Sequence, residues 1–157
     1  MTYISEDTKW YLADIVMECQ VEGNPQNVVH INTLLIRSDS PEEALERAES
    51  LGKDEENSYL NPTDQQVTWF YRGLRELSVI TEDLEDGAEL MYEERVGVSP
   101  EELQGMVRER SQFSVFQPLT DREPSYPDYA SKEIVQEAKE WMRAEYERRV
   151  RGMVENN

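Results

Sequence analysis

The sequence has few of the residues that mark secreted, zinc-binding or membrane-spanning proteins. Cys19 is its single cysteine among 157 residues, which excludes an internal disulfide and a zinc site with several thiolate ligands. No apolar run approaches the roughly 18 residues of a membrane span. The N-terminal residues have neither the basic start nor the apolar stretch of a secretory signal. We therefore expect a cytoplasmic protein.

Basic residues are scarce as well. Sixteen Lys and Arg stand against 34 Asp and Glu, which gives a formal net charge of −18. Nucleic-acid phosphates and anionic membrane surfaces bind clusters of basic residues, so we expect neither as a direct partner. The charge is uneven, because residues 39–58 have a net charge of −6 and residues 76–102 one of −9, whereas residues 131–157 are neutral. The sequence therefore divides into an acidic body and a neutral C-terminal segment.

Two runs of residues predict a β-hairpin near the N-terminus. Apolar and polar residues alternate over residues 9–21, and residues 28–37 are rich in β-branched side chains. Residues 23–27 contain Gly, Asn and Pro, which are typical of a turn.

A helix start follows this hairpin. Ser40 is suited to the N-cap, Pro41 to the first helical position, and Glu43 to closing a capping box with Ser40. We expect a helix over residues 41–51 that ends at Gly52, because glycine is favoured after the last helical turn.

The next stretch repeats this order of elements. Residues 53–65 are polar and predict a loop, and residues 66–80 predict a strand with a bulge at Gly73. Further strands are predicted over residues 88–96 and 113–116, with a second helix between them. The sequence therefore predicts an α+β fold with a mainly antiparallel sheet, in the order β-β-α-β-β-α.

The two predicted β-β-α units share anchor residues at one spacing. Trp10 and Trp69 lie 59 positions apart, and so do Ser40 and Ser99, each of which opens a Ser-Pro-Glu-Glu helix start. A fixed offset is typical of an internal duplication. The alternative is that a common helix start occurs twice by chance, since the residues between the anchors share little.

A linker and a long helix are predicted after residue 117. Three prolines and two tyrosines in residues 118–130 are typical of an extended linker, which separates the acidic domain (residues 1–117) from a helix over residues 131–157. One apolar stripe runs along this helix, formed by Val135, Ala138, Met142, Tyr146, Val150 and Met153 and widened by Ile134 and Trp141. Such a stripe packs on the sheet or binds a partner, which includes a second copy of the chain.

Cys19 and His30 are the candidates for catalysis, because each occurs once. If the hairpin turn is centred between Asn24 and Pro25, Cys19 faces His30, and a histidine beside a cysteine favours a thiolate nucleophile. A shift of the register by one residue pairs Cys19 with Ile31 instead. The alternative to catalysis is a small buried cysteine and a structural histidine.

The acidic residues Asp83, Glu85 and Asp86 are the candidates for a metal site, because a loop rich in carboxylates can bind a hard cation. The loop lacks the ligand spacing of an EF-hand, so a solvated acidic turn is the alternative. The sequence has no glycine-rich phosphate-binding loop, and we expect no cofactor.

The remaining candidates are apolar side chains suited to protein binding. Aromatic residues on strands pack in a core or form an interaction surface. The interaction candidates are Trp10, Trp69 and Tyr71 in the predicted strands and Val135, Trp141, Met142 and Tyr146 in the predicted C-terminal helix.

Six segments of the chain carry a family resemblance, namely Lys9–Ala13, Val28–Ile36, Asp39–Ala44, Val67–Trp69, Gly73–Arg75 and Leu84–Leu90. Over roughly residues 8–95 they resemble the DUF4288 family of uncharacterised bacterial proteins. The resemblance implies no activity, and no residue inherits a role from it. It leaves Gly73, Arg75 and the turn at residues 85–87 as features of a shared scaffold or surface.

Three hypotheses for function follow from the sequence. The first is a non-catalytic protein that binds another protein or regulates it as an adaptor, through the aromatic residues or the C-terminal helix. The second is an acidic mimic of nucleic acid that competes for a basic groove. The third is a small enzyme that uses Cys19 and His30.

Overall fold

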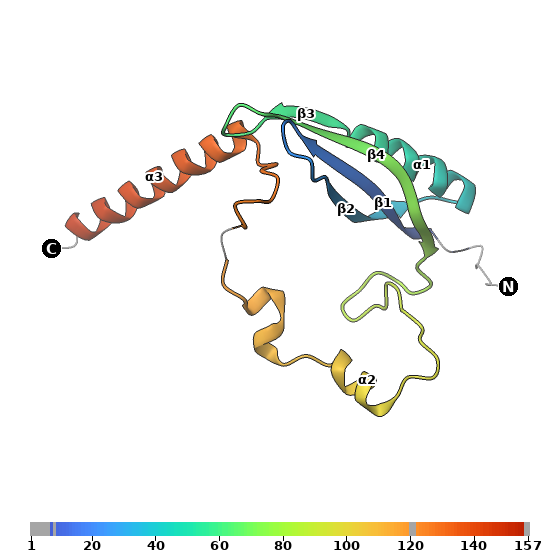
Figure 1. The fold of residues 1–157 in the computed structure, drawn as a ribbon. Helices are drawn as coiled ribbons and strands as arrows, with labels where there is room; N and C mark the ends of the chain where they lie inside the picture. Colours follow the sequence, from blue (N-terminus) through green and yellow to red (C-terminus); the bar gives the residue numbers. More distant parts are fainter. Residues whose placement is uncertain (1–6, 8, 120–121, 156–157) are drawn as a thin grey trace. The chain divides into compact units, whose positions relative to one another are not determined.

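The computed structural model describes residue 7 and the ranges 9–119 and 122–155. Its elements follow one another along the chain as labelled in Figure 1. They are β1 (Trp10–Val21), β2 (Val28–Arg37), α1 (Pro41–Asp54), β3 (Asn57–Leu60), β4 (Gln66–Val79), α2 (Pro100–Met106), two short 3₁₀ turns (Arg110–Gln112 and Ser114–Phe116) and α3 (Lys132–Glu155).

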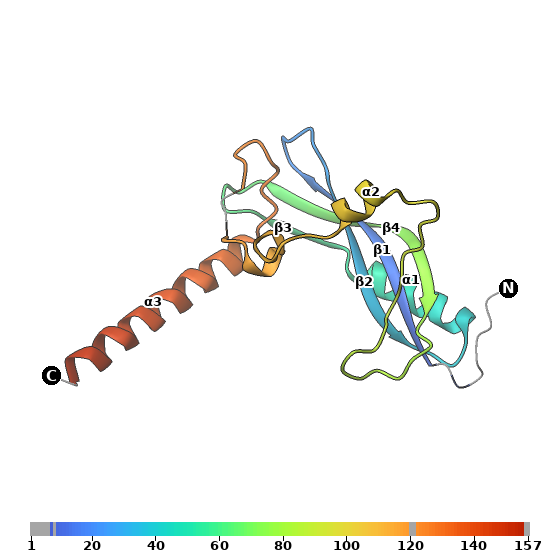
Figure 2. The ribbon, with the colours of Figure 1, turned by 90° about the horizontal axis from the view of Figure 1, so that it is seen from below.

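The four strands form one antiparallel sheet in the order β2-β1-β4-β3. Figure 2 shows β1 between β2 and β4. This sheet and the helices around it confirm the predicted α+β class. The predicted strands over residues 9–21 and 28–37 are confirmed as β1 and β2. They were predictable because alternating and β-branched residues are local sequence signals, and the two strands pair with each other.

Helix α1 covers one face of the sheet (Figure 1). Odd-numbered residues of β1 point to this face, where Tyr11 and Ala13 pack with Ile36 of β2 and with Ala44 and Ala48 of α1. Each of these five residues is at most 2% exposed. Small residues on α1 therefore let the helix lie close to the sheet.

The predicted N-cap of α1 is confirmed, but the predicted capping box and helix end are not. The Ser40 N–H donates to Ser38 Oγ, and the Glu43 carboxylate accepts from Ser38 Oγ, so Glu43 does not close the box. The Ser40 side chain accepts a hydrogen bond from the Glu43 backbone N–H at 3.2 Å. The helix continues past Gly52 to Asp54. Gly52 is buried against the ring of Tyr71, so this glycine provides close packing instead of a helix end.

The second hairpin is formed by β3 and β4, and not by the two strands that the sequence predicted over residues 66–80 and 88–96. Residues 53–65, predicted as a loop, contain β3, which pairs with the start of β4. Residues 88–96, predicted as a strand, form neither strand nor helix. They carry like charges at Glu89, Glu93 and Glu94, and among the described residues no strand pairs with them. The order β-β-α-β-β-α is therefore correct, but its fourth strand is β4 and not residues 88–96.

The bulge predicted at Gly73 lies in β4. The register between β1 and β4 shifts twice, once on each side of the pair of Val16 with Gly73. Gly73 has a φ of 135°, which glycine adopts without steric cost. Arg72 and Arg75 are the extra residues at the two shifts. The one bulge predicted at Gly73 is therefore two bulges in the structure, one on each side of this glycine.

Two further predictions about residues 99–116 have opposite outcomes. Ser99 caps α2 with a full capping box, in which its side chain accepts from the Glu102 N–H and its own N–H donates to the Glu102 carboxylate. Residues 113–116, predicted as a short strand, include the 3₁₀ turn Ser114–Phe116. At the offset of 59 residues β1 corresponds to β4, but β2 corresponds to residues 87–96, which form no strand. The structure therefore does not reproduce an internal duplication at this offset.

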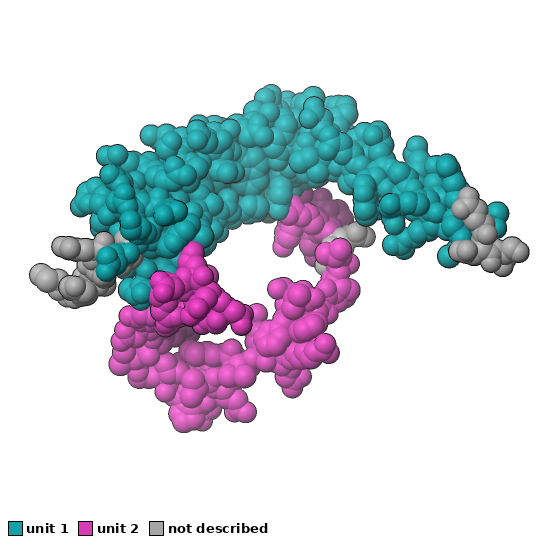
Figure 3. Space-filling view, turned by 180° about the vertical axis from the view of Figure 1, so that it is seen from behind, with its two compact units in different colours: residues 1–81, 127–157 teal, residues 82–126 magenta. Residues whose placement is uncertain are grey.

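The chain divides into two units, which Figure 3 shows in different colours. The first consists of residues 1–81 and 127–157, and the second of residues 82–126. The first unit contains the sheet, α1 and α3, and the second contains α2 and the 3₁₀ turns. These boundaries differ from the predicted segments 1–117, 118–130 and 131–157.

Candidate functional site

The sheet face away from α1 carries a buried carboxylate bound by two donors. Asp14 of β1 accepts a hydrogen bond from Thr33 Oγ1 at 2.7 Å and another from Arg75 Nη2 at 2.8 Å. Thr33, and then Arg75, holds the pKa of the Asp14 carboxyl below its usual value. Asp14 is 8% exposed, so these donors replace the water that would otherwise stabilise its charge.

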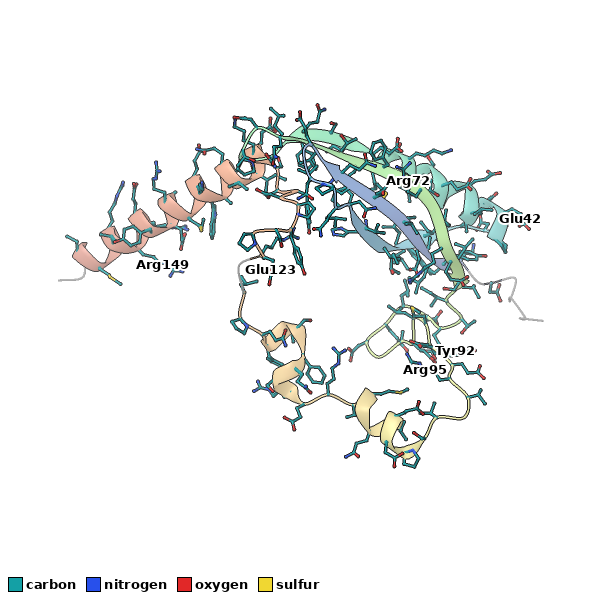
Figure 4. The ribbon with its side chains drawn as sticks, in the orientation of Figure 1. Glu42, Arg72, Tyr92, Arg95, Glu123 and Arg149 are labelled. Carbon is teal, nitrogen blue, oxygen red and sulfur yellow. The ribbon has the colours of Figure 1, made fainter. Side chains whose placement is uncertain are left out.

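Glu18 forms a second pair on the same face. Arg72 donates to Glu18 Oε1 from Nη2 at 2.7 Å and from Nε at 3.0 Å, and the Asn27 amide donates to the other carboxylate oxygen. Asn27, and then Arg72, lowers the pKa of Glu18. Arg72, labelled in Figure 4, also lies 4.7 Å from the centroid of the Phe70 ring.

Both arginines are the extra residues of the bulges in β4. A bulge redirects a side chain and breaks the backbone ladder locally, and here Arg72 and Arg75 each bond a carboxylate of the central strand β1. The two ion pairs therefore fix the irregular part of β4 to β1. Arginine stays protonated in proteins. The two arginines therefore stabilise the shape of the strand or bind an anionic group, and they do not transfer protons.

The predicted contact between Cys19 and His30 is wrong. In the hairpin Cys19 pairs with Val28 and His30 pairs with Met17, a register that differs from both alternatives drawn from the sequence. Instead, the His30 ring centroid lies 4.9 Å from that of Trp69 and 5.4 Å from that of Tyr129. His30 is therefore part of an aromatic cluster.

Cys19 is fully buried on the same face as this cluster. Burial raises the pKa of its thiol from 9.0 to about 11, whereas a nucleophilic cysteine needs a lowered pKa. The environment of Cys19 therefore matches the structural alternative that the sequence left open, and no observation favours the enzyme hypothesis.

We expect the Cys19 thiol to react with iodoacetamide at pH 8 at least about a hundredfold more slowly in the folded protein than in urea, because both its burial and its raised pKa suppress the thiolate. The raised pKa of Cys19 also makes the free energy of unfolding depend on pH. The contribution of the protonated thiol to stability is fully present below the pKa of the unfolded thiol, and it is lost as the pH rises towards about 11. The alkylation rates are measured by mass spectrometry. Equal rates in the folded and the urea-unfolded protein would contradict the burial of Cys19.

The three aromatic strand residues predicted as interaction candidates lie in three different surroundings. Trp69 belongs to the cluster with His30 and donates from Nε1 to Tyr59 Oη at 3.0 Å. Tyr71 packs on Gly52 of α1. Trp10 lies on the opposite sheet face, with the Arg37 guanidinium 5.7 Å from its ring. The structure therefore does not bring these three side chains together into one surface.

The acidic residues Asp83, Glu85 and Asp86 lie exposed in the second unit. Ala88 N–H donates to the Glu85 carbonyl at 3.1 Å, and Gly87 has a φ of 86°, as in a tight turn. Within residues 7, 9–119 and 122–155, no group of three or more His, Cys, Asp or Glu side chains is arranged to hold a metal ion. The acidic turn is the better description of this segment.

The apolar side chains predicted for the C-terminal helix lie on α3. Trp141 is 67% exposed and Tyr146 70% exposed. Met142, Val150, Met153 and Ile134 are exposed as well, and Val135 is half-buried near the start of the helix. We call Ile134, Val135, Ala138, Trp141, Met142, Tyr146, Val150 and Met153 the α3 stripe.

The start of α3 is attached to the sheet by contacts that the sequence did not reveal. Tyr59 Oη donates to the Tyr129 carbonyl, and Asn61 Nδ2 donates to the Asp128 carbonyl at 3.0 Å. Lys132 forms an ion pair with Asp64. Tyr59, Asn61 and Asp64 belong to a stretch predicted as a loop. Its turn-forming residues were the only sequence signal there, and they did not indicate a contact with α3.

Among the described residues, no helix is long and apolar enough to span a membrane. The family model of DUF4288, a domain of unknown function, matches residues 10–92 of the chain. Comparisons with curated proteins and with solved structures give no match. The matched range covers more than half of the 157 residues and includes α1 and β1 to β4 but neither α2 nor α3. The chain therefore belongs to the DUF4288 family, as its sequence segments suggested.

Proposed function

We propose that this protein is a non-catalytic protein-binding domain in which α3 is the binding element. The observation that supports the proposal is the α3 stripe, whose large side chains are mostly exposed on a helix of 24 residues. Aromatic residues that are exposed in the free protein and buried on binding contribute most to the affinity of protein interfaces. Trp141 and Tyr146 are the residues we expect to contribute most.

Two further features favour α3 over the rest of the surface. Its first turn is attached to the sheet through Lys132 and the preceding residues Asp128 and Tyr129, so less freedom is lost when a partner binds the helix. Residues 131–157 also have no net charge in a chain of net charge −18. A partner can therefore approach α3 without the repulsion that the acidic body imposes on acidic proteins.

The test compares affinity capture by the wild-type chain with capture by the double variant Trp141→Ala/Tyr146→Ala. We expect the double variant to lose specific partners, with affinity reduced at least about thirtyfold, because each aromatic hot spot contributes roughly 2 kcal/mol. The matched control is Glu140→Ala/Glu147→Ala, which changes the other side of the same helix and keeps its length and helical propensity.

Retention of the same partners by the Trp141→Ala/Tyr146→Ala variant would sink the proposal. So would a wild-type chain that captures no partner and does not associate with itself. Circular dichroism of both double variants establishes that α3 remains helical in each.

Acidic mimicry is the second candidate, because α1 exposes Glu42, Glu46 and Glu49 at helical spacing (Glu42 in Figure 4). Exposed carboxylates of this kind attract a basic groove. The same capture experiment at two salt concentrations separates the candidates. Binding through the α3 stripe persists at high salt, whereas binding to the α1 carboxylates weakens steeply.

A further inference from the structure

Strand β2 is an edge of the sheet, and half of its backbone groups are directed away from β1. Ser38 N–H donates to the Lys9 carbonyl at 2.9 Å, one step beyond the pair of Arg37 with Trp10. Hydrogen-bonded and non-bonded pairs alternate in an antiparallel ladder. Even-numbered residues of β2 therefore bond to β1, and the odd-numbered ones, Val29 to Arg37, direct N–H and C=O groups outward.

The opposite edge of the sheet is blocked in several ways. Strand β3 has only four residues, and the part of β4 beyond it contains two bulges with the charged side chains of Arg72 and Arg75. The Tyr71 N–H at this edge donates to Glu56 Oε1 at 3.1 Å. Short strands, bulges and charges are the features by which proteins prevent pairing at an edge.

Strand β2 has none of these features. It is ten residues long, pairs with β1 without a register shift, and contains no Pro, Lys, Asp or Glu, with Arg37 at its very end. Its outward-bonding residues include Val29, Ile31 and Leu35, which are 52%, 43% and 49% exposed. No other strand among the described residues pairs with this edge. A long, regular, apolar edge of this kind is a template for strand addition.

We propose that β2 pairs antiparallel with β2 of a second copy of the chain, so that two four-stranded sheets join into one. This surface is separate from α3 and does not depend on the function proposed for α3. A second copy is the occupant that the edge itself favours, because antiparallel pairing of two β2 strands brings the same exposed apolar residues against one another. The edge is uncharged over residues 28–36, whereas the following residues 39–58 have a net charge of −6, so β2 is where two acidic chains can approach most closely.

The two-fold symmetry of such a dimer allows only certain registers. Opposing residues must lie on the same face of the joined sheet, so the axis passes through a residue and not between two. An axis at Asn32 or at Thr33, in the middle of β2, pairs most of the strand. With the axis at Asn32, Val29 faces Leu35 of the second copy and Ile31 faces Thr33. With the axis at Thr33, Ile31 faces Leu35. Both registers pair apolar or neutral side chains, except that the second also places Arg37 beside Val29.

The test measures the mass of the chain by sedimentation equilibrium from about 1 µM to about 1 mM, the range of weak to moderate dimers. We expect a dimer in the wild type, with a dissociation constant raised roughly tenfold or more by Ile31→Lys, because each copy then loses the apolar contact of Ile31 and must desolvate a charged edge side chain. Leu60→Lys is the matched control, since Leu60 is an exposed apolar residue of the other edge strand. It should leave the dimer unchanged.

Crosslinking of an introduced cysteine establishes the register, in a Cys19→Ser background so that each variant has one cysteine. In Asn32→Cys or Thr33→Cys, whichever residue lies at the axis, mild oxidation should give a disulfide-linked dimer, because residues facing each other across the axis are within disulfide reach. Leu60→Cys should stay monomeric on the same gel. A wild type that is monomeric over the whole range overturns the proposal. A dimer that survives Ile31→Lys but dissociates in Trp141→Ala/Tyr146→Ala also overturns it and assigns self-association to α3.

Discussion

Gly52→Ala should destabilise the protein by about 3 kcal/mol, because the new methyl group has no room. A Cβ at Gly52 would lie 2.4 to 2.9 Å from three ring carbons of Tyr71, far inside contact distance. Gly52 continues the row of small residues formed by Ala44 and Ala48 on the buried side of α1. The helix can relieve the overlap only by moving away from the sheet, which opens the core around Ala44 and Ala48, or by displacing Tyr71.

Urea unfolding of Gly52→Ala against the wild type measures this effect. Gly152→Ala is the control, because Gly152 also lies in a helix but has no atom within 4 Å of the added Cβ. That substitution should leave stability unchanged or raise it slightly, since alanine favours helix. Adding Gly52→Ala to a Tyr71→Ala background should cost much less than adding it to the wild type. An equal cost in both backgrounds would mean that Tyr71 is not the obstacle.

The elements that the sequence predicted well are those with complete local signals. The N-caps at Ser40 and Ser99 depend on side chains within four residues, and both form, although only Ser99 also has the full capping box. Residues 88–96 show the limit of such signals. Alternation is present there, but a strand exists only when another strand pairs with it, and no local pattern reveals a partner.

The pairing register of the first hairpin was not predictable from the sequence, for a related reason. The prediction assumed a turn placed evenly between the strands, yet β1 continues to pair with β4 after it has left β2, with Gln20 opposite Thr68 and Val21 opposite Val67. The Asn24 N–H closes the turn on the Val21 carbonyl at 3.0 Å. The distant strand therefore set the register, and the contact between Cys19 and His30 could not be judged from the hairpin alone.

The ion pairs of Asp14 and Glu18 were missed because their partners depend on the bulges. Asp14 and Glu18 lie four residues apart in one strand, so they share a face in any register. Arg72 and Arg75 lie three apart, and a regular strand would put them on opposite faces. Only the two register shifts between β1 and β4 bring both arginines to the face of the carboxylates.

Asn61→Ala should cost at least about 3 kcal/mol of stability and loosen the attachment of α3, because Asn61 is fully buried and its amide bonds to several groups at once. Its Oδ1 accepts from the Thr63 N–H at 3.1 Å and from the Gln65 N–H at 2.9 Å, and its Nδ2 donates to the Asp128 carbonyl at 3.0 Å. Alanine leaves two part-buried N–H groups and one part-buried carbonyl without these partners, and each lost hydrogen bond costs roughly 1 kcal/mol.

Two measurements separate the global from the local part of this effect. Urea unfolding gives the loss of stability, and hydrogen exchange of residues 127–131 reports the attachment of α3. The control is Asn57→Ala at the start of β3, four residues before Asn61, where the exposed side chain accepts from the Ser58 N–H at 2.8 Å. Stability within about 1 kcal/mol of the wild type in Asn61→Ala would contradict the assignment. If stability falls while exchange at residues 127–131 keeps its wild-type order relative to the core, Asn61 supports the β3–β4 turn alone, and α3 depends on Tyr59 and Lys132 for its position.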